Sequence, residues 1–314
     1  MTARPLGLPP GDAICYSGYR QGQSPQDGTY PSHEEIHQDL QLLSRGWKYL
    51  RLYDSGVHAR RVLEVISKYR LDFKVMLGAD IAAEVSNPNC PWGADYAEGQ
   101  LLCNRAMNDV EIARMIELAN QYPCNVFALS IGNEASVDWT DHKVPVERLI
   151  EFAQLVRKHT GQPVTFCENY VPWQGQLDAL AAELDFISLH TYPVWEYRDI
   201  TQAMDYTREN YNSVANRFPD KPVVITEAGW TTRSNGRGIE PWNANPKSQA
   251  LYYLQLMDWS REANVLTFVF EAFDEPWKGS PDPDEPEKHW GLFTVDREPK
   301  EALAHLYAPG CAEL

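Results

Sequence analysis

The sequence lacks the features of membrane-spanning, metal-binding and redox proteins. Only 6 of its 314 residues are cysteines, and they form no C-x-x-C pair and no zinc-ligand spacing. No uncharged apolar run approaches the roughly 18 residues that a membrane span requires, so we expect no span. The N-terminal residues include no apolar run of signal-peptide length. Localisation therefore stays open between the cytoplasm and export with the signal removed.

Positive charge is also scarce. The chain has 28 Lys and Arg against 44 Asp and Glu, which gives a net charge of −16. Because such a surface repels phosphate backbones, we expect no nucleic-acid partner. The chain has neither a phosphate-binding glycine loop nor the G-x-S-x-G of a serine hydrolase. We expect no cofactor and no metal, since His33 and His37 lack a third ligand, and no obligate protein partner is evident.

The cysteines are consistent with free thiols. Cys15, Cys124 and Cys167 lie in or beside apolar segments, where we expect them to be buried. Cys90 and Cys103 flank one loop, and the sequence leaves open whether they pair.

Short apolar runs alternate with longer amphipathic segments along the whole chain. The runs predict strands at 13–17, 49–53, 72–78, 125–131, 164–168, 186–190, 222–226 and 266–270. The helical 3.6-residue period predicts helices at 34–43, 59–69, 109–121, 146–159, 204–217, 248–263 and 298–307. Ser32, Pro145 and Asn245 are expected helix starts, and Gly161 follows a helix end. Residues 84–104 are expected to form an inserted loop.

Eight strands that alternate with helices predict a (β/α)8 TIM barrel of the α/β class. A doubly wound open sheet is the alternative, but no G-x-G-x-x-G follows any strand. No linker divides the chain, so we expect a single catalytic domain over residues 1–314, with the barrel at about 13–307.

In this fold the functional side chains lie where strands end. Eight of the ten tryptophans fall in the loops that follow strands: Trp92, Trp139, Trp173, Trp195, Trp230, Trp242, Trp277 and Trp290. Flat aromatic rings at a barrel mouth suit stacking on sugars, although they would also suit a flat cofactor. His190 ends the sixth strand, where a substrate contact and a structural hydrogen bond are equally expected.

Two glutamates stand out among the carboxylates at strand ends. Glu134 follows the fourth strand and Glu227 follows the seventh, 93 residues later, so they should face each other across the mouth. Glycoside hydrolysis requires such a pair, one carboxyl protonated and the other ionised. From the residues alone the pair is not unique, because Glu168, Glu271, Asp274 and Glu275 also follow strands.

A family resemblance narrows this choice. The chain resembles glycoside hydrolase family 17, the β-1,3-glucanases, over about residues 13–307. The motifs are G-N-E at 132–134, T-E-A-G-W at 226–230, L-R-L-Y-D at 50–54, Y-P at 192–193, F-D-E-P-W-K at 273–278 and H-W-G-L-F at 289–293. The 84–104 loop and Glu168 depart from the pattern of the plant enzymes.

The resemblance implies a role for each matching residue. Glu134 would be the acid/base and Glu227 the nucleophile of a retaining mechanism. Asn133 would hold the sugar 2-hydroxyl, Arg51 would keep Glu227 ionised, and Tyr192 would donate a hydrogen bond to Glu227. The remaining expected substrate-binding residues are Tyr53, Glu168, Trp173, His190, Trp230, Glu275, Trp277 and Lys278.

The expected partner is therefore a β-1,3-glucan or its oligosaccharides. Hydrolysis and transfer to a sugar acceptor use the same residues, and an acceptor side would be formed by Trp139, Trp173 or Trp195. Endo or exo action, β-1,4-linked substrates and a non-catalytic glycan-binding barrel stay open as alternatives.

Overall fold

The computed structural model describes residues 5–9 and 11–307. Within them the strands form one closed barrel in sequence order, each parallel to the next, and β1 pairs with β8 through Ala13 and Phe268. The strands are β1 Ala13–Cys15, β2 Tyr49–Arg51, β3 Lys74–Gly78, β4 Val126–Asn133, β5 Val164–Asn169, β6 Ile187–His190, β7 Val223–Ala228 and β8 Thr267–Val269. The predicted (β/α)8 barrel is confirmed.

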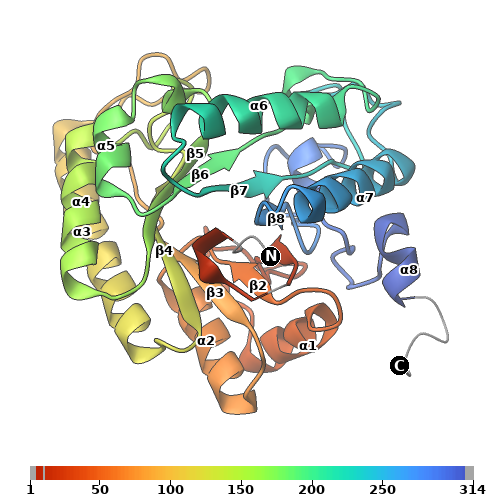
Figure 1. Ribbon diagram of the computed structural model, residues 1–314, viewed down its shortest axis with the longest axis horizontal. Helices are drawn as coiled ribbons and strands as arrows, with labels where there is room; N and C mark the ends of the chain where they lie inside the picture. The colour runs from red at the N-terminus through yellow and green to blue at the C-terminus, as the bar shows by residue number, and fades with distance from the viewer. Residues whose placement is uncertain (1–4, 10, 308–314) are drawn as a thin grey trace.

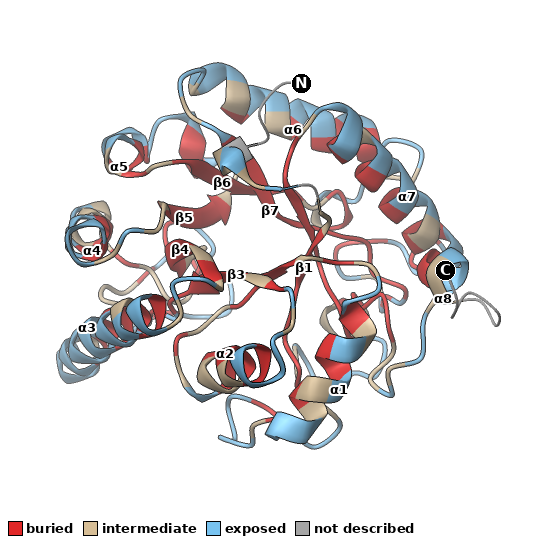
Figure 2. Cartoon of the chain, turned by 60° about the horizontal axis from the view of Figure 1, so that its bottom comes forward, coloured by how far each residue is buried: buried red, intermediate tan, exposed pale blue. Residues whose placement is uncertain are grey.

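Helices surround the barrel and bury their inner faces against it (Figures 1 and 2). They are α1 His33–Leu43, α2 Val57–Tyr69, α3 Glu98–Gln121, α4 Val146–His159, α5 Asp178–Glu183, α6 Ala203–Arg217, α7 Pro246–Glu262 and α8 Ala304–Tyr307. Short 3-10 turns occur at Pro5–Gly7, Pro172–Gln174, Val194–Glu196, Pro286–Lys288 and Glu301–Leu303. No helix among the described residues is long and apolar enough to cross a membrane.

Local sequence explains where several helices begin. The Ser32 side chain accepts a hydrogen bond from the backbone N–H of Glu35, whose side chain accepts one in return from the Ser32 N–H, so α1 starts with a capping box. Asn245 caps α7 ahead of Pro246, and Pro145 stands at the cap position of α4. All three predicted starts are confirmed.

Some predicted boundaries were wrong. Helix α3 starts at Glu98, inside the expected 84–104 loop. The prediction missed this start because the first turns of the helix are largely exposed and show no apolar period. The six-residue α5 is too short for a period to appear. Strands β4, β5 and β7 run one or two residues further than predicted, so Asn133 and Glu227 lie within strands.

The cysteines are only partly as expected. Cys15 and Cys167 are buried, but Cys124 is exposed because it lies in the turn before β4 rather than on a strand. Cys90 and Cys103 are both free thiols. Cys311 lies outside the described residues.

Candidate active site

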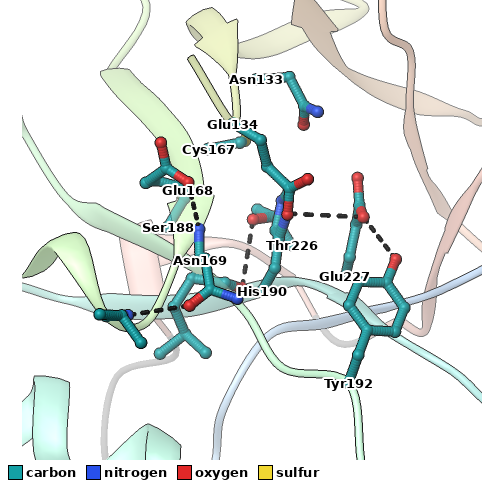
Figure 3. A network of polar contacts seen from close by, with 12 residues as sticks. Asn133, Glu134, Cys167, Glu168, Asn169, Ser188, His190, Tyr192, Thr226 and Glu227 are labelled. Carbon is teal, nitrogen blue, oxygen red and sulfur yellow. Dashed lines mark hydrogen bonds and ion pairs between the residues drawn. The ribbon is translucent and has the colours of Figure 1, made fainter. Parts of the chain in front are cut away.

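The two predicted glutamates converge at the carboxyl ends of the strands. Glu134 directly follows β4 and Glu227 lies in β7, so the closed barrel brings them together. One oxygen of each carboxylate lies within 4.8 Å of the other, and His190 at the end of β6 lies between them (Figure 3). This spacing is that of a retaining pair, since an inverting pair stands roughly 6.5–9.5 Å apart to admit a water.

The backbone around each glutamate is specialised. Glu134 has a φ of +46°, a left-handed conformation rare for residues other than glycine, and its N–H donates to the Cys167 carbonyl at 2.9 Å. Gly229, two residues after Glu227, allows no side chain, because a Cβ there would lie 2.0 Å from the Phe270 carbonyl oxygen. The glycine of the T-E-A-G-W motif is therefore a packing requirement of the barrel rim.

Glu227 is the more enclosed carboxylate and is held ionised. Arg51 of β2 donates to one oxygen, and the Tyr192 hydroxyl donates to the other. Burial alone would raise the pKa of Glu227, but the positive charges of His190 and Arg51 outweigh it and lower the pKa to about 2. A carboxylate ionised at every physiological pH suits a nucleophile.

Glu134 is the more accessible carboxylate. Its side chain is 28% exposed, against 7% for Glu227, and it lines the cavity. The Nδ1 of His190 lies 2.9 Å from its Oε1. An accessible carboxyl in contact with an imidazole nitrogen suits a group that must both give and take a proton.

His190 itself contacts the carboxylates and does not line the cavity. It is fully buried, and its Nδ1 also lies 3.5 Å from Glu227. Of the two expected roles, a substrate contact and a structural hydrogen bond, the structure places it in the second. Burial would lower the pKa of His190, but Glu227, Cys167 and Glu134 outweigh it and raise the pKa to about 10.

Asn133 and Tyr53 line the cavity beside the two glutamates. The Asn133 side-chain oxygen accepts from the Nη2 of Arg51, which fixes the amide, and the Arg51 guanidinium lies 4.3 Å from the centre of the Tyr53 ring. Arg51 is buried and acts on the site through its contacts with Glu227 and Asn133.

A second acidic group lies on the loop after β8. The Lys278 ammonium bridges Glu271, at 3.2 Å, and Glu275, while the Trp277 indole N–H donates to Glu275 at 3.1 Å. Burial and the neighbouring Glu275 raise the pKa of Glu271 well above its usual range. Glu275, Trp277 and Lys278 line the cavity as expected.

The cavity has a volume of about 1080 Å³, enough for several sugar rings. Aromatic side chains make up much of its wall: Tyr16, Tyr19, Tyr30, Tyr53, Tyr192, Trp195, Phe270, Trp277 and Trp290.

Besides Arg51 and His190, three expected substrate-binding residues do not line this cavity. Trp173 and Trp230 are buried, and their indole N–H groups donate to the backbone carbonyls of Ser188 and Asn243. The loops after β5 and β7 pack back onto the barrel, so both indole rings are buried there. Glu168 is also fully buried and accepts hydrogen bonds from the backbone N–H and the hydroxyl of Ser136.

The other tryptophans divide between the wall and the surface. Trp195, Trp277 and Trp290 line the cavity, whereas Trp92, Trp139 and Trp242 are exposed outside its lining. Of the three residues expected on an acceptor side, only Trp195 is at the cavity.

Several lining residues were missed from the sequence. His142 lines the cavity, and its Nε2 lies 2.8 Å from the Asn133 carbonyl oxygen. Met107 and Val110 also line the cavity, from α3. No motif marks His142 or Val110, and Met107 lies before the predicted start of α3.

Glu134, His190 and Glu227 are close enough together to hold a metal ion on distance alone. The two oxygens of Glu227 are, however, already contacted by Arg51 and Tyr192. We retain the expectation of a metal-free mechanism.

Comparison with known proteins agrees with this geometry. The model of the BtgE/BtgC glycoside hydrolase domain matches residues 13–291. A glucan 1,3-beta-glucosidase of Arthroderma benhamiae is 31% identical over 142 residues, 40% of this chain and 44% of that protein. A probable glucan endo-1,3-beta-glucosidase, btgC, of Aspergillus clavatus is 25% identical over 295 residues, 87% of this chain and 39% of that protein. The matches thus span less than half the length of these relatives.

Solved structures give the same result. An endo-laminarinase from Formosa Hel1_33_131 superposes with a TM-score of 0.81 at 27% identity and covers 94% of this chain and 86% of its own. A glycoside hydrolase family 17 β-1,3-glucanosyltransferase from Rhizomucor miehei shares the fold, with a TM-score of 0.71 at 22% identity over 92% of this chain and 95% of its own. The family resemblance seen in the motifs is confirmed, and the chain belongs to the BtgE/BtgC glycoside hydrolase domain family.

Proposed function

We propose that this chain is a retaining glycoside hydrolase that cleaves β-1,3-linked glucan or its oligosaccharides. The observation that carries the proposal is the close approach of the two carboxylates, with oxygens of Glu134 and Glu227 within 4.8 Å. The names of the relatives support the linkage: glucan 1,3-beta-glucosidase, glucan endo-1,3-beta-glucosidase and endo-laminarinase.

The mechanism is a double displacement. The Glu227 carboxylate attacks the anomeric carbon while Glu134 protonates the departing glycosidic oxygen, which leaves a glycosyl-enzyme ester. Glu134 then removes a proton from the acceptor, which attacks the same carbon and releases Glu227. The Asn133 amide, fixed by Arg51, would hold the sugar 2-hydroxyl, a contact that strengthens in the transition state.

A β-1,3-glucanosyltransferase is the second candidate, because a sugar hydroxyl could replace water as the acceptor. The observation in its favour is Trp195, an indole on the cavity wall that could stack on an acceptor sugar. The glucanosyltransferase of Rhizomucor miehei shares the fold.

The deciding experiment is a time course of the reaction with a purified β-1,3-glucan hexasaccharide, in which mass spectrometry identifies the products by their masses. Products that are only shorter mean hydrolysis, and their sizes separate end-trimming from internal cleavage. Products longer than the input mean transfer. No change, with a Glu227→Gln variant as the blank, would contradict β-1,3-glucan as the substrate.

A further inference from the structure

The ring of His190 is enclosed between the two candidate catalytic carboxylates. Its Nδ1 lies 2.9 Å from Glu134 and 3.5 Å from Glu227, and the residue has no exposed surface. Figure 3 shows the ring reaching from the end of β6 to the point where the two carboxylates meet. A proton on Nδ1 therefore has both carboxylates, and no solvent, as its neighbours.

Charged and titratable groups from three other strands act on this ring. Glu134 lies at the end of β4 and Glu227 in β7, and the Cys167 thiol of β5, like both carboxylates, raises the pKa of His190. The Nε2 has no hydrogen-bonding partner among the described residues. The guanidinium of Arg51 on β2 is held by Glu227 and Asn133. Two carboxylates against this one guanidinium leave one negative charge, which an imidazolium at His190 would neutralise.

We propose that His190 carries the catalytic proton of the free enzyme and passes it to Glu134 when substrate binds. The proposal rests on the proposed function and adds to it the origin of the proton. His190 acts through Glu134 and does not touch the sugar. Its role is to keep Glu134 supplied with a proton although a second carboxylate, Glu227, stays ionised close by.

The proton balance closes over both steps. In the first step, the Nδ1–H bond breaks and a proton forms an O–H bond on Glu134. That O–H bond then breaks as the proton moves to the glycosidic oxygen, while the C1–O bond breaks and the Glu227 oxygen bonds to C1. In the second step, the acceptor loses a proton to Glu134, the Glu227 ester bond breaks, and the proton returns to Nδ1.

The glycosyl-enzyme itself favours the right protonation state. Once Glu227 is esterified, its negative charge, 3.5 Å from Nδ1 in the free enzyme, is gone. The imidazole then binds a proton less tightly and stays neutral while Glu134 acts as a base. When the ester is cleaved the charge returns and so does the proton. The charge of Glu227 thus raises the proton affinity of His190 in the free enzyme, and its loss lowers that affinity in the glycosyl-enzyme.

The first test follows the proton directly and does not depend on the substrate. Protein with 15N-labelled histidine is titrated by NMR, and the His190 signals are identified by their loss in His190→Gln; His159→Gln, an exposed site at the end of α4, is the control. We expect both ring nitrogens of His190 to be protonated at pH 7, and Glu227→Gln to lower its titration midpoint by roughly one to three pH units. A neutral His190 ring at pH 7 in the wild type would overturn the proposal.

The second test follows the chemistry. In an aryl β-laminaribioside, a good leaving group such as 2,4-dinitrophenolate departs without being protonated. A poor leaving group such as phenolate must be protonated by the enzyme as it departs. We expect His190→Gln to slow the phenyl substrate roughly 100-fold and the dinitrophenyl substrate no more than about threefold. Equal losses on both substrates would mean that the ring is only structural.

The two tests separate this proposal from the proposed function. If wild-type protein cleaves no β-1,3-glucoside, the proposed function fails, while the titration still decides where the proton is. If His190→Gln does not fold, the ring signals of His190 are assigned through bonds from its backbone in the wild-type protein, and the wild-type and Glu227→Gln titrations decide.

Discussion

The two glutamates of the site have the same side chain and differ only in what surrounds it. Arg51 and Tyr192 contact Glu227, while Glu134 has one ring nitrogen of His190 and an opening to the cavity. The proposed division into nucleophile and acid/base therefore rests on neighbours from other strands.

Removing either carboxyl should separate the two roles. We expect Glu134→Ala to lose roughly 10²–10⁴ in turnover of oligosaccharide, since general acid catalysis contributes that much. On an aryl glycoside whose leaving group departs without protonation, azide, which needs no base, should rescue Glu134→Ala and give a β-glycosyl azide, read by NMR of the product. Glu227→Ala should give no β-azide. Near-wild-type activity in either variant would refute the assignment.

Arg51 should set the acid limb of the pH profile. Glu227 must be ionised to attack. Burial raises its pKa, but the positive charges of His190 and Arg51 outweigh burial and lower the pKa of Glu227 to about 2. In Arg51→Met the acid limb of the kcat/KM profile should move to higher pH by roughly one to three units, because the pKa of Glu227 rises towards its usual value and above. Arg51→Lys keeps the charge and should shift less. An unmoved limb in Arg51→Met would contradict the role.

At the scale of elements, the residues just past β4 are held from the neighbouring strand. Glu168 of β5 accepts from the backbone N–H of Ser136 at 2.9 Å, two residues after Glu134. Burial, then the charge of Glu134, raises the pKa of Glu168 to about 7. The hydrogen bonds from Ser136 favour the ionised carboxylate, but burial and the charge of Glu134 outweigh them, so the folded chain favours the protonated carboxyl.

Stability should therefore depend on pH through Glu168. The folded state binds its proton more tightly than the unfolded chain, so its contribution is lost as pH rises from 4.5 to about 7. The loss is about 3 kcal/mol in the free energy of unfolding. Urea unfolding at pH 5 and pH 8 measures it. Glu168→Gln should remove most of this difference, whereas Glu262→Gln, exposed at the end of α7, should keep it.

Gly229 joins the end of β7 to the rim of β8. A Cβ there would lie 2.0 Å from the Phe270 carbonyl, so Gly229→Ala should lower the free energy of unfolding by about 1–3 kcal/mol or more. Gly99→Ala, in α3 with no atom within 4 Å of the new Cβ, is the matched control and should not destabilise. Thermal melts of both variants decide it, and equal melting temperatures would refute the argument.

The sequence predicted the elements with a clear period and the residues at their ends. Glu134 and Glu227 follow apolar strands, which parallel closure brings to one rim. The prediction that Trp173 and Trp230 contact the substrate was wrong. The sequence does not distinguish a loop that packs back onto the barrel from one that reaches into the cavity. Met107 was missed because the early turns of α3 show no apolar period.

At the scale of the whole molecule, one buried carboxylate connects residues near the two ends of the described chain. Asp39 of α1 accepts from Arg297 at 2.8 Å, from Arg20 at 3.0 Å and from the Tyr16 hydroxyl at 3.2 Å. Asp39 has no exposed surface. Residues near both termini of the described chain therefore depend on a single side chain.

Asp39→Asn should be strongly destabilising. Removal of one partner from a buried ion pair costs about 3–5 kcal/mol, because the remaining charge is left uncompensated. Asp72→Asn removes an exposed ion pair with Lys48 and should cost no more than about 1 kcal/mol. Urea unfolding measures both, and equal effects would show that Asp39 is not a tie.

The placement of the two glutamates on β4 and β7 has a further consequence. Arg51 and Glu134 come from the first half of the barrel, and His190, Tyr192 and Glu227 come from the second. If neighbouring strands separate and the barrel opens, Glu134 and Glu227 move apart although both residues are still present. We therefore expect an incompletely folded chain to be inactive although both glutamates are present.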